Sequence, residues 1–148
     1  MLDIARNCTI LSISAKIALT KGKKVPMSNR SLMILIAGPY RSGTGDDPEL
    51  MARNLRGLES VALPLYRAGH IPLIGEWIAL PLLREAGSLR PGDAVYDEIL
   101  YPIANRLLTR CDAVLRLPGA SKGADEDVRL ARERGLMVYE RLADVPGM

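Results

Sequence analysis

The feature that most constrains the fold is a short apolar segment that stops at a glycine-rich loop. Residues 32–37 are all apolar, and residues 38–47 contain three glycines, an arginine and the hydroxyls of Ser42 and Thr44. A continuous run of branched apolar residues is typical of a parallel strand that is covered on both faces. Because α/β proteins bind ligands just beyond the carboxyl ends of such strands, we expect this loop to approach a phosphate or a sugar.

Strand and helix signals alternate along the rest of the chain. Asp47 and Asp93 are suited to cap helices, and proline interrupts the apolar pattern at Pro64 and Pro102, where we expect bends. The alternation predicts a parallel sheet with helices on both faces. The expected elements are a helix to about residue 68, strand 70–75 at a sheet edge, a helical piece 81–86, a helix to about residue 110, strand 112–117, helix 124–134 and strand 136–139.

The charge is unevenly distributed between two parts of the chain. Residues 1–30 carry six Lys or Arg side chains and one Asp, a net charge of +5, so residues 31–148 carry −2 of the total of +3. We expect residues 1–30 to be a basic, partly disordered extension, with RNA or anionic lipid contact as the alternative, and residues 31–148 to be one domain. Four of the five lysines precede Met27, which suggests an appendage or a start at Met27. The mixed charges after residue 30 do not favour a nucleic-acid partner.

The cysteines and the hydropathy pattern exclude other classes. Cys8 and Cys111 form no disulfide framework and no metal-binding pattern, so we expect no metal. No apolar stretch approaches the roughly 20 residues that span a bilayer. We therefore expect a cytoplasmic protein without a membrane partner.

A second glycine-containing loop follows the strand predicted at 112–117. In an open parallel sheet, residues 38–47 and 118–127 can meet over one crevice. Ser121 and Gly123 stand at a helix N-terminus, which attracts anions such as phosphate. The carboxylates at residues 125–127 would repel a phosphate, and they have the alternative role of stabilising the helix dipole.

Several short motifs follow one another along the chain. They are Ile-Ala-Gly-Pro-Tyr at 36–40, Arg-Ala-Gly-His-Ile-Pro at 67–72, Cys-Asp-Ala-Val-Leu at 111–115, Leu-Pro-Gly at 117–119, Ser-Lys-Gly-Ala at 121–124, and Ala131. In this order and spacing they resemble the nucleoside 2-deoxyribosyltransferase-like family. The resemblance implies a flavodoxin-like fold, a three-layer α/β/α arrangement with a doubly wound parallel sheet of four to five strands. It also implies cleavage of an N-glycosidic bond in a deoxynucleoside or nucleotide, without a cofactor.

The resemblance also implies roles for individual residues. The family's nucleophilic carboxylate falls on Asp127, where the family carries glutamate, and Glu126 stands one place earlier as the alternative. Tyr40 is expected near the nucleophile, where it can orient the carboxylate or be an ordinary half-buried tyrosine of the loop. The reaction would be a double displacement through an oxocarbenium-like transition state. An aspartate that assists the leaving base in the family makes Asp97 a candidate.

Other residues are candidates for substrate binding. Arg41, Ser42 and Gly43 are suited to a 5′-phosphate. Trp77 can stack on a base or belong to the core, and Glu76 can bind ribose hydroxyls or cap a helix. We expect structural roles for His70 and Asp112 at the opposite end of the sheet, and a solvated position for Asn54. The remaining candidates are the loop residues Gly38, Pro39, Gly119, Ser121 and Gly123.

Two further functions stay open beside glycosidic cleavage. The same fold can serve as a non-catalytic nucleotide-binding or sensing module. A flavin protein is the third possibility, and the acidic residues 125–127 argue against a flavin phosphate there. The expected partner is a small nucleoside or nucleotide, and the resemblance implies a homo-oligomer, a dimer or a tetramer.

Overall fold

A four-stranded parallel sheet organises residues 30–148, the part of the chain that the computed structural model describes. The expectations for the basic segment, Cys8 and Met27 therefore lie outside the described residues. The sheet order is β2-β1-β3-β4, with all neighbours parallel. The strands are β1 (Met33–Ala37), β2 (Ile71–Leu73), β3 (Ala113–Arg116) and β4 (Met137–Tyr139).

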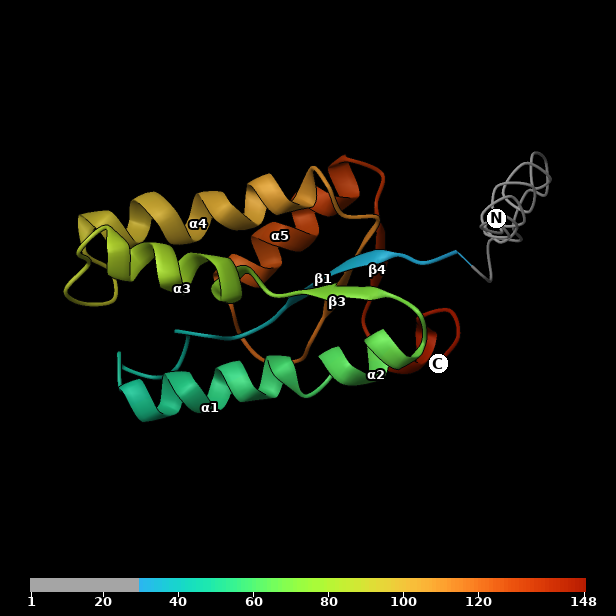
Figure 1. Ribbon diagram of the computed structural model, residues 1–148, viewed down its shortest axis with the longest axis horizontal. Coiled ribbons are helices and arrows are strands. Elements are labelled where there is room, and N and C mark those ends of the chain that lie inside the picture. Colours follow the sequence, from blue (N-terminus) through green and yellow to red (C-terminus); the bar gives the residue numbers. More distant parts are fainter. Residues whose placement is uncertain (1–29) are drawn as a thin grey trace, which may run out of the picture.

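Helices cover both faces of the sheet (Figure 1). Ile34 and Ile36 of β1 pack on one side, and Leu35 and Ala37 pack on the other, because successive strand residues point to opposite faces. The result is a three-layer α/β/α arrangement of the flavodoxin-like type, as expected. One face carries α1 (Pro48–Glu59), α2 (Ala62–Arg67) and the 3-10 turn η3 (Leu142–Asp144), and the other carries α3 (Gly75–Glu85), α4 (Ala94–Leu108) and α5 (Lys122–Glu133).

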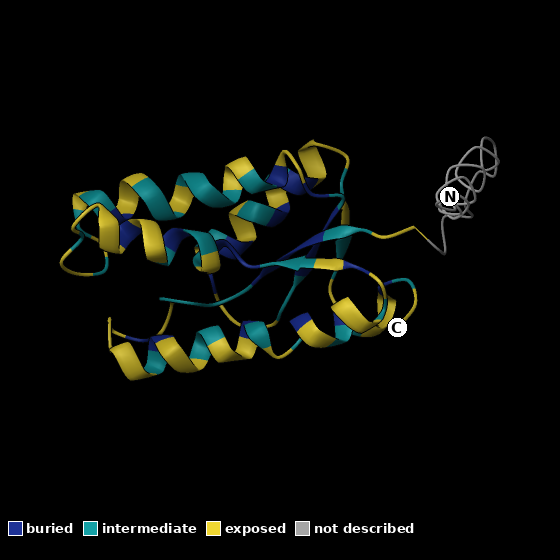
Figure 2. Ribbon diagram, viewed as in Figure 1, coloured by how far each residue is buried: buried dark blue, intermediate teal, exposed yellow. Residues whose placement is uncertain are grey.

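Burial distinguishes the central strands from the edge strands (Figure 2). Ala113, Val114 and Leu115 of β3 are fully buried. The edge strands β2 and β4 have three residues each and are partly exposed. The edge position expected for the proline-containing strand is confirmed, since Pro72 lies in β2 opposite Ile34.

The prediction of a single helix that ends near residue 68 is wrong in one respect, because this segment forms two helices. α1 ends at Glu59 and α2 begins at Ala62. Pro64 lacks the N–H that would bond to the Ser60 carbonyl, and its ring excludes that carbonyl from the helical position. The helix is therefore interrupted at residues 60–61, whereas a bend at Pro64 was predicted.

The segment after β2 also differs from the prediction. The strand ends at Leu73 instead of Gly75, and α3 begins at Gly75 and continues through Pro81. Glu76 thus stands in the first turn of a helix. For α4, the predicted cap is confirmed, since the Tyr96 N–H donates to Asp93 at 2.7 Å. Pro102 lies inside α4 without ending it.

The amino end of the sheet holds the two residues expected to be structural. His70 is buried, its Nδ1 accepts the Leu32 N–H at 3.1 Å, and its Nε2 therefore donates to the Pro146 carbonyl at 2.7 Å. Asp112 accepts the Met33 N–H at 2.9 Å and pairs with Arg30 at 2.7 Å. Neither residue lines the cavity described below. Among the helices of residues 30–148, none has the length and apolar character needed to cross a membrane.

Candidate functional site

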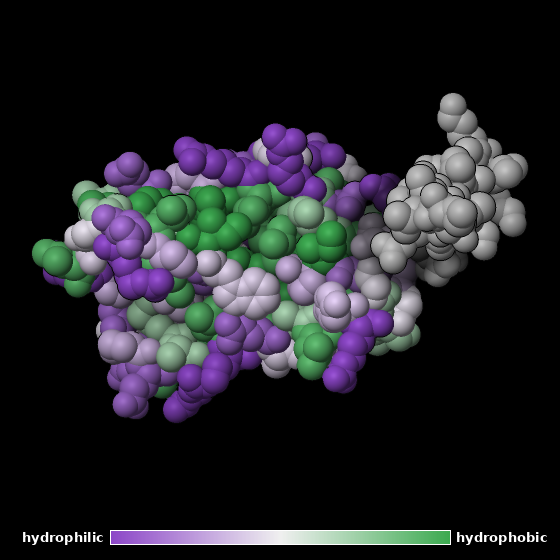
Figure 3. All heavy atoms as spheres, in the orientation of Figure 1, coloured by the Kyte–Doolittle hydropathy of each residue, from purple (hydrophilic) through white to green (hydrophobic). Residues whose placement is uncertain are grey.

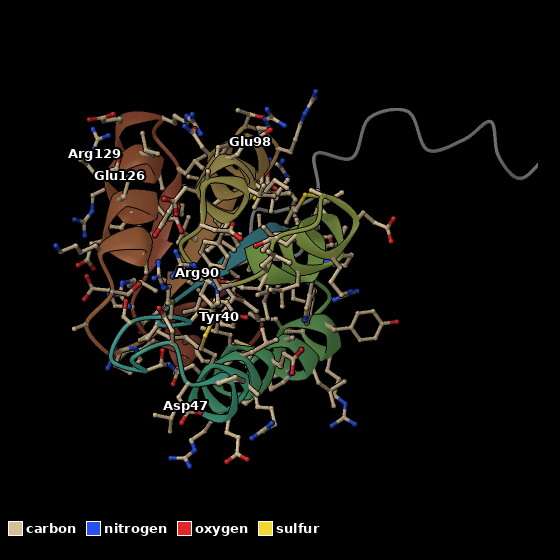
Figure 4. The ribbon with its side chains drawn as sticks, turned by 90° about the vertical axis from the view of Figure 1, so that its left-hand side faces the viewer. Tyr40, Asp47, Arg90, Glu98, Glu126 and Arg129 are labelled. Atoms are coloured by element: carbon tan, nitrogen blue, oxygen red, sulfur yellow. The ribbon has the colours of Figure 1, made fainter. Side chains whose placement is uncertain are left out.

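A cavity of about 820 Å³ opens at the carboxyl ends of β1 and β3. The two loops that follow these neighbouring strands meet there, as expected for the point where the strand order reverses. Figure 4 looks onto this end of the sheet, with Tyr40 near its centre. The polar side chains of the lining are Tyr40, Arg41, Ser42, Asp46, Glu76, Tyr101, Asn105, Ser121, Lys122, Glu126 and Asp127, and Gly38, Gly75 and Gly123 contribute backbone.

The loop after β1 is fixed by contacts within itself and with α1. The buried Thr44 donates its hydroxyl hydrogen to the Arg41 carbonyl at 2.6 Å. The Asn54 side-chain amide donates to the Tyr40 carbonyl at 2.9 Å. Asn54 is therefore a half-buried support of the loop, and the solvated position expected for it is wrong.

Arg41 lies in the wall of the cavity with its guanidinium already engaged. Nε and Nη2 donate to the two carboxylate oxygens of Asp46 at 2.6 and 3.0 Å. The guanidinium also lies over the Tyr96 ring, 5.5 Å from its centre, and against the backbone of Gly92. A phosphate at this position would have to compete with Asp46 for the guanidinium.

The loop after β3 ends in the N-cap of α5. The Ser121 hydroxyl oxygen accepts the Ala124 N–H at 3.2 Å, and Ser121 is buried. Ser121 and Gly123 line the cavity as expected, although the Ser121 oxygen serves the helix cap.

The two candidate nucleophiles have different surroundings. Burial, followed by the charges of Glu76 and Glu126, raises the pKa of the half-buried Asp127 carboxyl to about 7, and Arg116 opposes this shift. Glu126 is exposed and accepts hydrogen bonds from Arg129 at 2.6 and 2.8 Å, which lower its pKa. Glu126 and Arg129 lie together on α5 in Figure 4, away from Tyr40. Of the two, Asp127 combines partial burial with a raised pKa, a combination that is common at functional sites.

Glu76 supplies a second half-buried carboxylate to the same cavity. It lies in the first turn of α3, and burial raises its pKa. Tyr40 is also half-buried, and its pKa is raised by burial and then by the charge of Glu76. Tyr40 therefore keeps its proton at neutral pH and can donate a hydrogen bond.

Five of the sequence-predicted site residues do not line the cavity: Pro39, Gly43, Trp77, Asp97 and Gly119. Trp77 is neither a core residue nor a stacking platform in the cleft. It is 40% exposed, and its indole N–H donates to Glu59 at 2.8 Å, which joins α3 to α1. Asp97 is exposed on α4, so the carboxylate expected to assist a leaving base is not in the cleft.

Sequence reasoning missed three residues around the cleft. Tyr96 is buried beside Arg41, and its hydroxyl has no hydrogen-bond partner among the described residues. Tyr101 lines the cavity from α4. Arg116 is the last residue of β3. The sequence could have revealed it, because a charged residue at the carboxyl end of a buried apolar strand places its side chain beside the loops that follow the strands.

The fold and the cleft define an α/β domain of the flavodoxin-like type with a cavity whose lining includes Asp46, Glu76, Glu126 and Asp127. Pockets of this size and position are typical of ligand and cofactor sites. No group of three or more potential metal ligands occurs within residues 30–148. No protein-family model matches the chain, and no curated protein or solved structure matches it either.

Proposed function

We propose that this domain binds a nucleoside or nucleotide in the cleft and cleaves or transfers its N-glycosidic bond. The observation that carries the proposal is the half-buried carboxylate of Asp127 on the wall of an 820 Å³ cavity, with a pKa raised to about 7. The resemblance of the loop motifs to nucleoside 2-deoxyribosyltransferase-like proteins supports the same reaction. Asp127 is the nucleophile of the proposal and Glu126 is not, because Glu126, although it also lines the cavity, is 52% exposed and paired with Arg129.

In the first step, an Asp127 carboxylate oxygen attacks C1′ of the sugar. The C1′–N bond breaks as the new C1′–O bond forms, and its electron pair passes to the leaving nitrogen of the base. Glu76 and Asp127 are a coupled pair that shares one proton; in the reactive form Glu76 holds this proton, and it donates it to the leaving nitrogen in place of the candidate Asp97. A pair of carboxyl groups that differ in protonation is the usual arrangement for cleavage of a glycosidic bond.

In the second step, water or a second base attacks C1′ of the glycosyl ester. The Glu76 carboxylate accepts the proton of the incoming nucleophile, and the bond between C1′ and Asp127 breaks. Tyr40 donates a hydrogen bond that orients the nucleophilic carboxylate. Arg41 and Ser42 stand at the place where a 5′-phosphate would lie, if the substrate carries one.

The assembly of the protein is a further part of the proposal. Apolar side chains gather over α3 and α4 on the face shown in Figure 3. Leu82, Leu89 and Tyr101 are 45%, 93% and 53% exposed. Together with the resemblance, this face supports a homo-oligomer, which sedimentation analysis of the purified protein would test.

The cytoplasmic location and the absence of a nucleic-acid partner stay predictions.

The reaction is tested by incubating the protein with a panel of deoxynucleosides and deoxynucleoside 5′-monophosphates. Release of free base is followed by chromatography, and binding is measured in parallel by calorimetry. Base release that Asp127→Asn abolishes and Glu126→Gln preserves supports the proposal. Binding without release would favour the non-catalytic sensing module, and equal rates in both variants would refute Asp127 as nucleophile.

A further inference from the structure

The guanidinium of Arg116 connects β3, the following turn and the first turn of α5. Arg116 is the last residue of β3 and pairs with Ala37 of β1. Its side chain is only 15% exposed. It donates to the Leu117 carbonyl, to the Gly119 carbonyl at 2.9 Å, and to Asp125 from Nη2 at 2.8 Å and from Nε at 3.2 Å. One side chain thus binds two carbonyls of the turn and a carboxylate of the helix.

The hydrogen bonds from Arg116 to Asp125 determine which side of α5 carries Asp127 toward the cavity. Consecutive residues of an α-helix are rotated by about 100°, so Asp125 and Asp127 point to nearly opposite sides of α5. Asp125 is exposed and Asp127 faces the cavity. A contact that fixes Asp125 therefore also fixes the rotation of the helix at which Asp127 points inward.

We propose that Arg116 is a positioning residue, which holds the turn and the first turn of α5 so that the Asp127 carboxylate is presented to the cleft. The catalytic part of this inference rests on the proposed function. The positioning part concerns the protein alone and can be measured without turnover.

The charge of Arg116 acts in the same sense as its hydrogen bonds. It lowers the pKa of Asp127, against burial and the charges of Glu76 and Glu126, so loss of Arg116 would raise that pKa further. A larger fraction of Asp127 would then be protonated and unable to attack. The charged or titratable groups around this cleft are Tyr40, Arg41 and Asp46 from the β1 loop, Glu76 from α3, Tyr96 and Tyr101 from α4, Arg116 from β3, and Lys122 and Glu126 from α5.

The inference is tested with Arg116→Met and with two companion variants. Arg116→Met is expected to lower kcat by about 30-fold or more while KM changes by less than about 3-fold, because a small misplacement of a reacting group has an effect of this order. The acid limb of its pH–rate profile is expected at higher pH. Asp125→Asn keeps the Arg116 charge and weakens the contact, so kcat is expected to fall without an upward move of that limb. Arg129→Met is the matched control, because it removes an exposed guanidinium from α5. It is expected to leave kcat and the position of the acid limb unchanged.

Carbon-13 NMR of the Asp127 carboxyl gives the second readout. Its titration midpoint is expected to rise in Arg116→Met and to stay in place in Arg129→Met. A midpoint and a kcat that Arg116→Met leaves unchanged would overturn the inference. If the wild-type protein releases no base, the proposed function fails, whereas faster amide hydrogen exchange in the first turn of α5 in both Arg116→Met and Asp125→Asn still supports the positioning role, and exchange that neither variant changes refutes it. Circular dichroism of each variant verifies folding, and Asp125→Asn replaces Arg116→Met as the decisive kcat test if the latter does not fold.

Discussion

Gly119 lies so close to Pro39 that a Cβ atom on Gly119 would stand 2.6 Å from the Pro39 Cγ. Gly119 also has a φ of 113°, in the region that favours glycine. The two residues belong to the two loops that form the cleft, although neither of them lines it. Their contact fixes the distance between the loop that carries Tyr40 and the turn that precedes α5.

The first prediction follows from this contact. Gly119→Ala is expected to destabilise the protein by about 1–3 kcal/mol, because it combines an unfavourable φ with a steric clash. Base release is expected to fall as well, since the loops must separate. Urea unfolding measures the stability. Gly123→Ala is the control, because nothing lies within 4 Å of its added Cβ and no loss of stability is expected; an equal loss in both variants would contradict the role of the contact.

The second prediction concerns the stability cost of Asp127. Burial raises its pKa from 3.8 to about 7, so between these values the unfolded chain releases a proton that the folded protein retains. Stability therefore falls as the pH rises from about 4 to 7. Asp127→Asn is expected to stabilise the protein by about 1–3 kcal/mol above pH 7, and not below pH 4, while it abolishes base release.

Thermal unfolding of both proteins across this pH range measures the effect of Asp127→Asn. The control is Glu126→Gln, whose wild-type carboxylate is exposed and has a lowered pKa. It is expected to give no stabilisation at pH 7. A gain for Asp127→Asn that is equally large at pH 4 would show that its cause is not ionisation.

The third prediction concerns the pair formed by Glu76 and Asp127. Removal of the Glu76 charge by Glu76→Gln removes one cause of the raised pKa of Asp127. The acid limb of kcat/KM is therefore expected to move to lower pH. The rate itself is expected to fall by about 10²–10⁴, the usual contribution of a general acid. Asp97→Asn serves as control, since Asp97 is exposed outside the cleft, and a similar loss there would restore Asp97 as the proton donor.

The fourth prediction concerns phosphate recognition by Arg41. Asp46 engages this guanidinium with two hydrogen bonds, and it has a φ of 64° that asparagine tolerates. Asp46→Asn is therefore expected to increase affinity for a 5′-monophosphate by about 5-fold or more and to leave affinity for the nucleoside unchanged. Calorimetry with both ligands measures this. Equal changes for the two ligands would remove Arg41 from phosphate recognition.

The sheet was accessible to sequence reasoning because its signals are local. The apolar run at 32–37 predicts a buried strand. Glycines and prolines mark the ends of the elements, and they predict the alternation of strands with helices. The break at residues 60–61 was missed because the effect of Pro64 falls on the residue four places earlier. The start of α3 at Gly75 was missed because an apolar segment such as 71–80 has no periodicity that separates a strand from a helix.

The site was less accessible, because it depends on helix rotation and on strand order. The sequence did not decide between Asp127 and Glu126. Both line the cavity in the structure, but Asp127 is half-buried, whereas Glu126 is exposed and bound to Arg129. Asp97 was a candidate by its place in the chain, whereas Glu76 reaches the cleft because β2 lies beside β1. The contacts of Arg116 depend on the folded turn, so no spacing in the chain reveals them.

Pro72 has a consequence for the growth of the sheet beyond one molecule. An edge strand offers its unpaired N–H and carbonyl groups to any extended chain that approaches it. β2 is an edge of only three residues, and one of its backbone nitrogens carries no hydrogen. Addition of a further strand at this edge, one route to fibrous polymers, is therefore disfavoured.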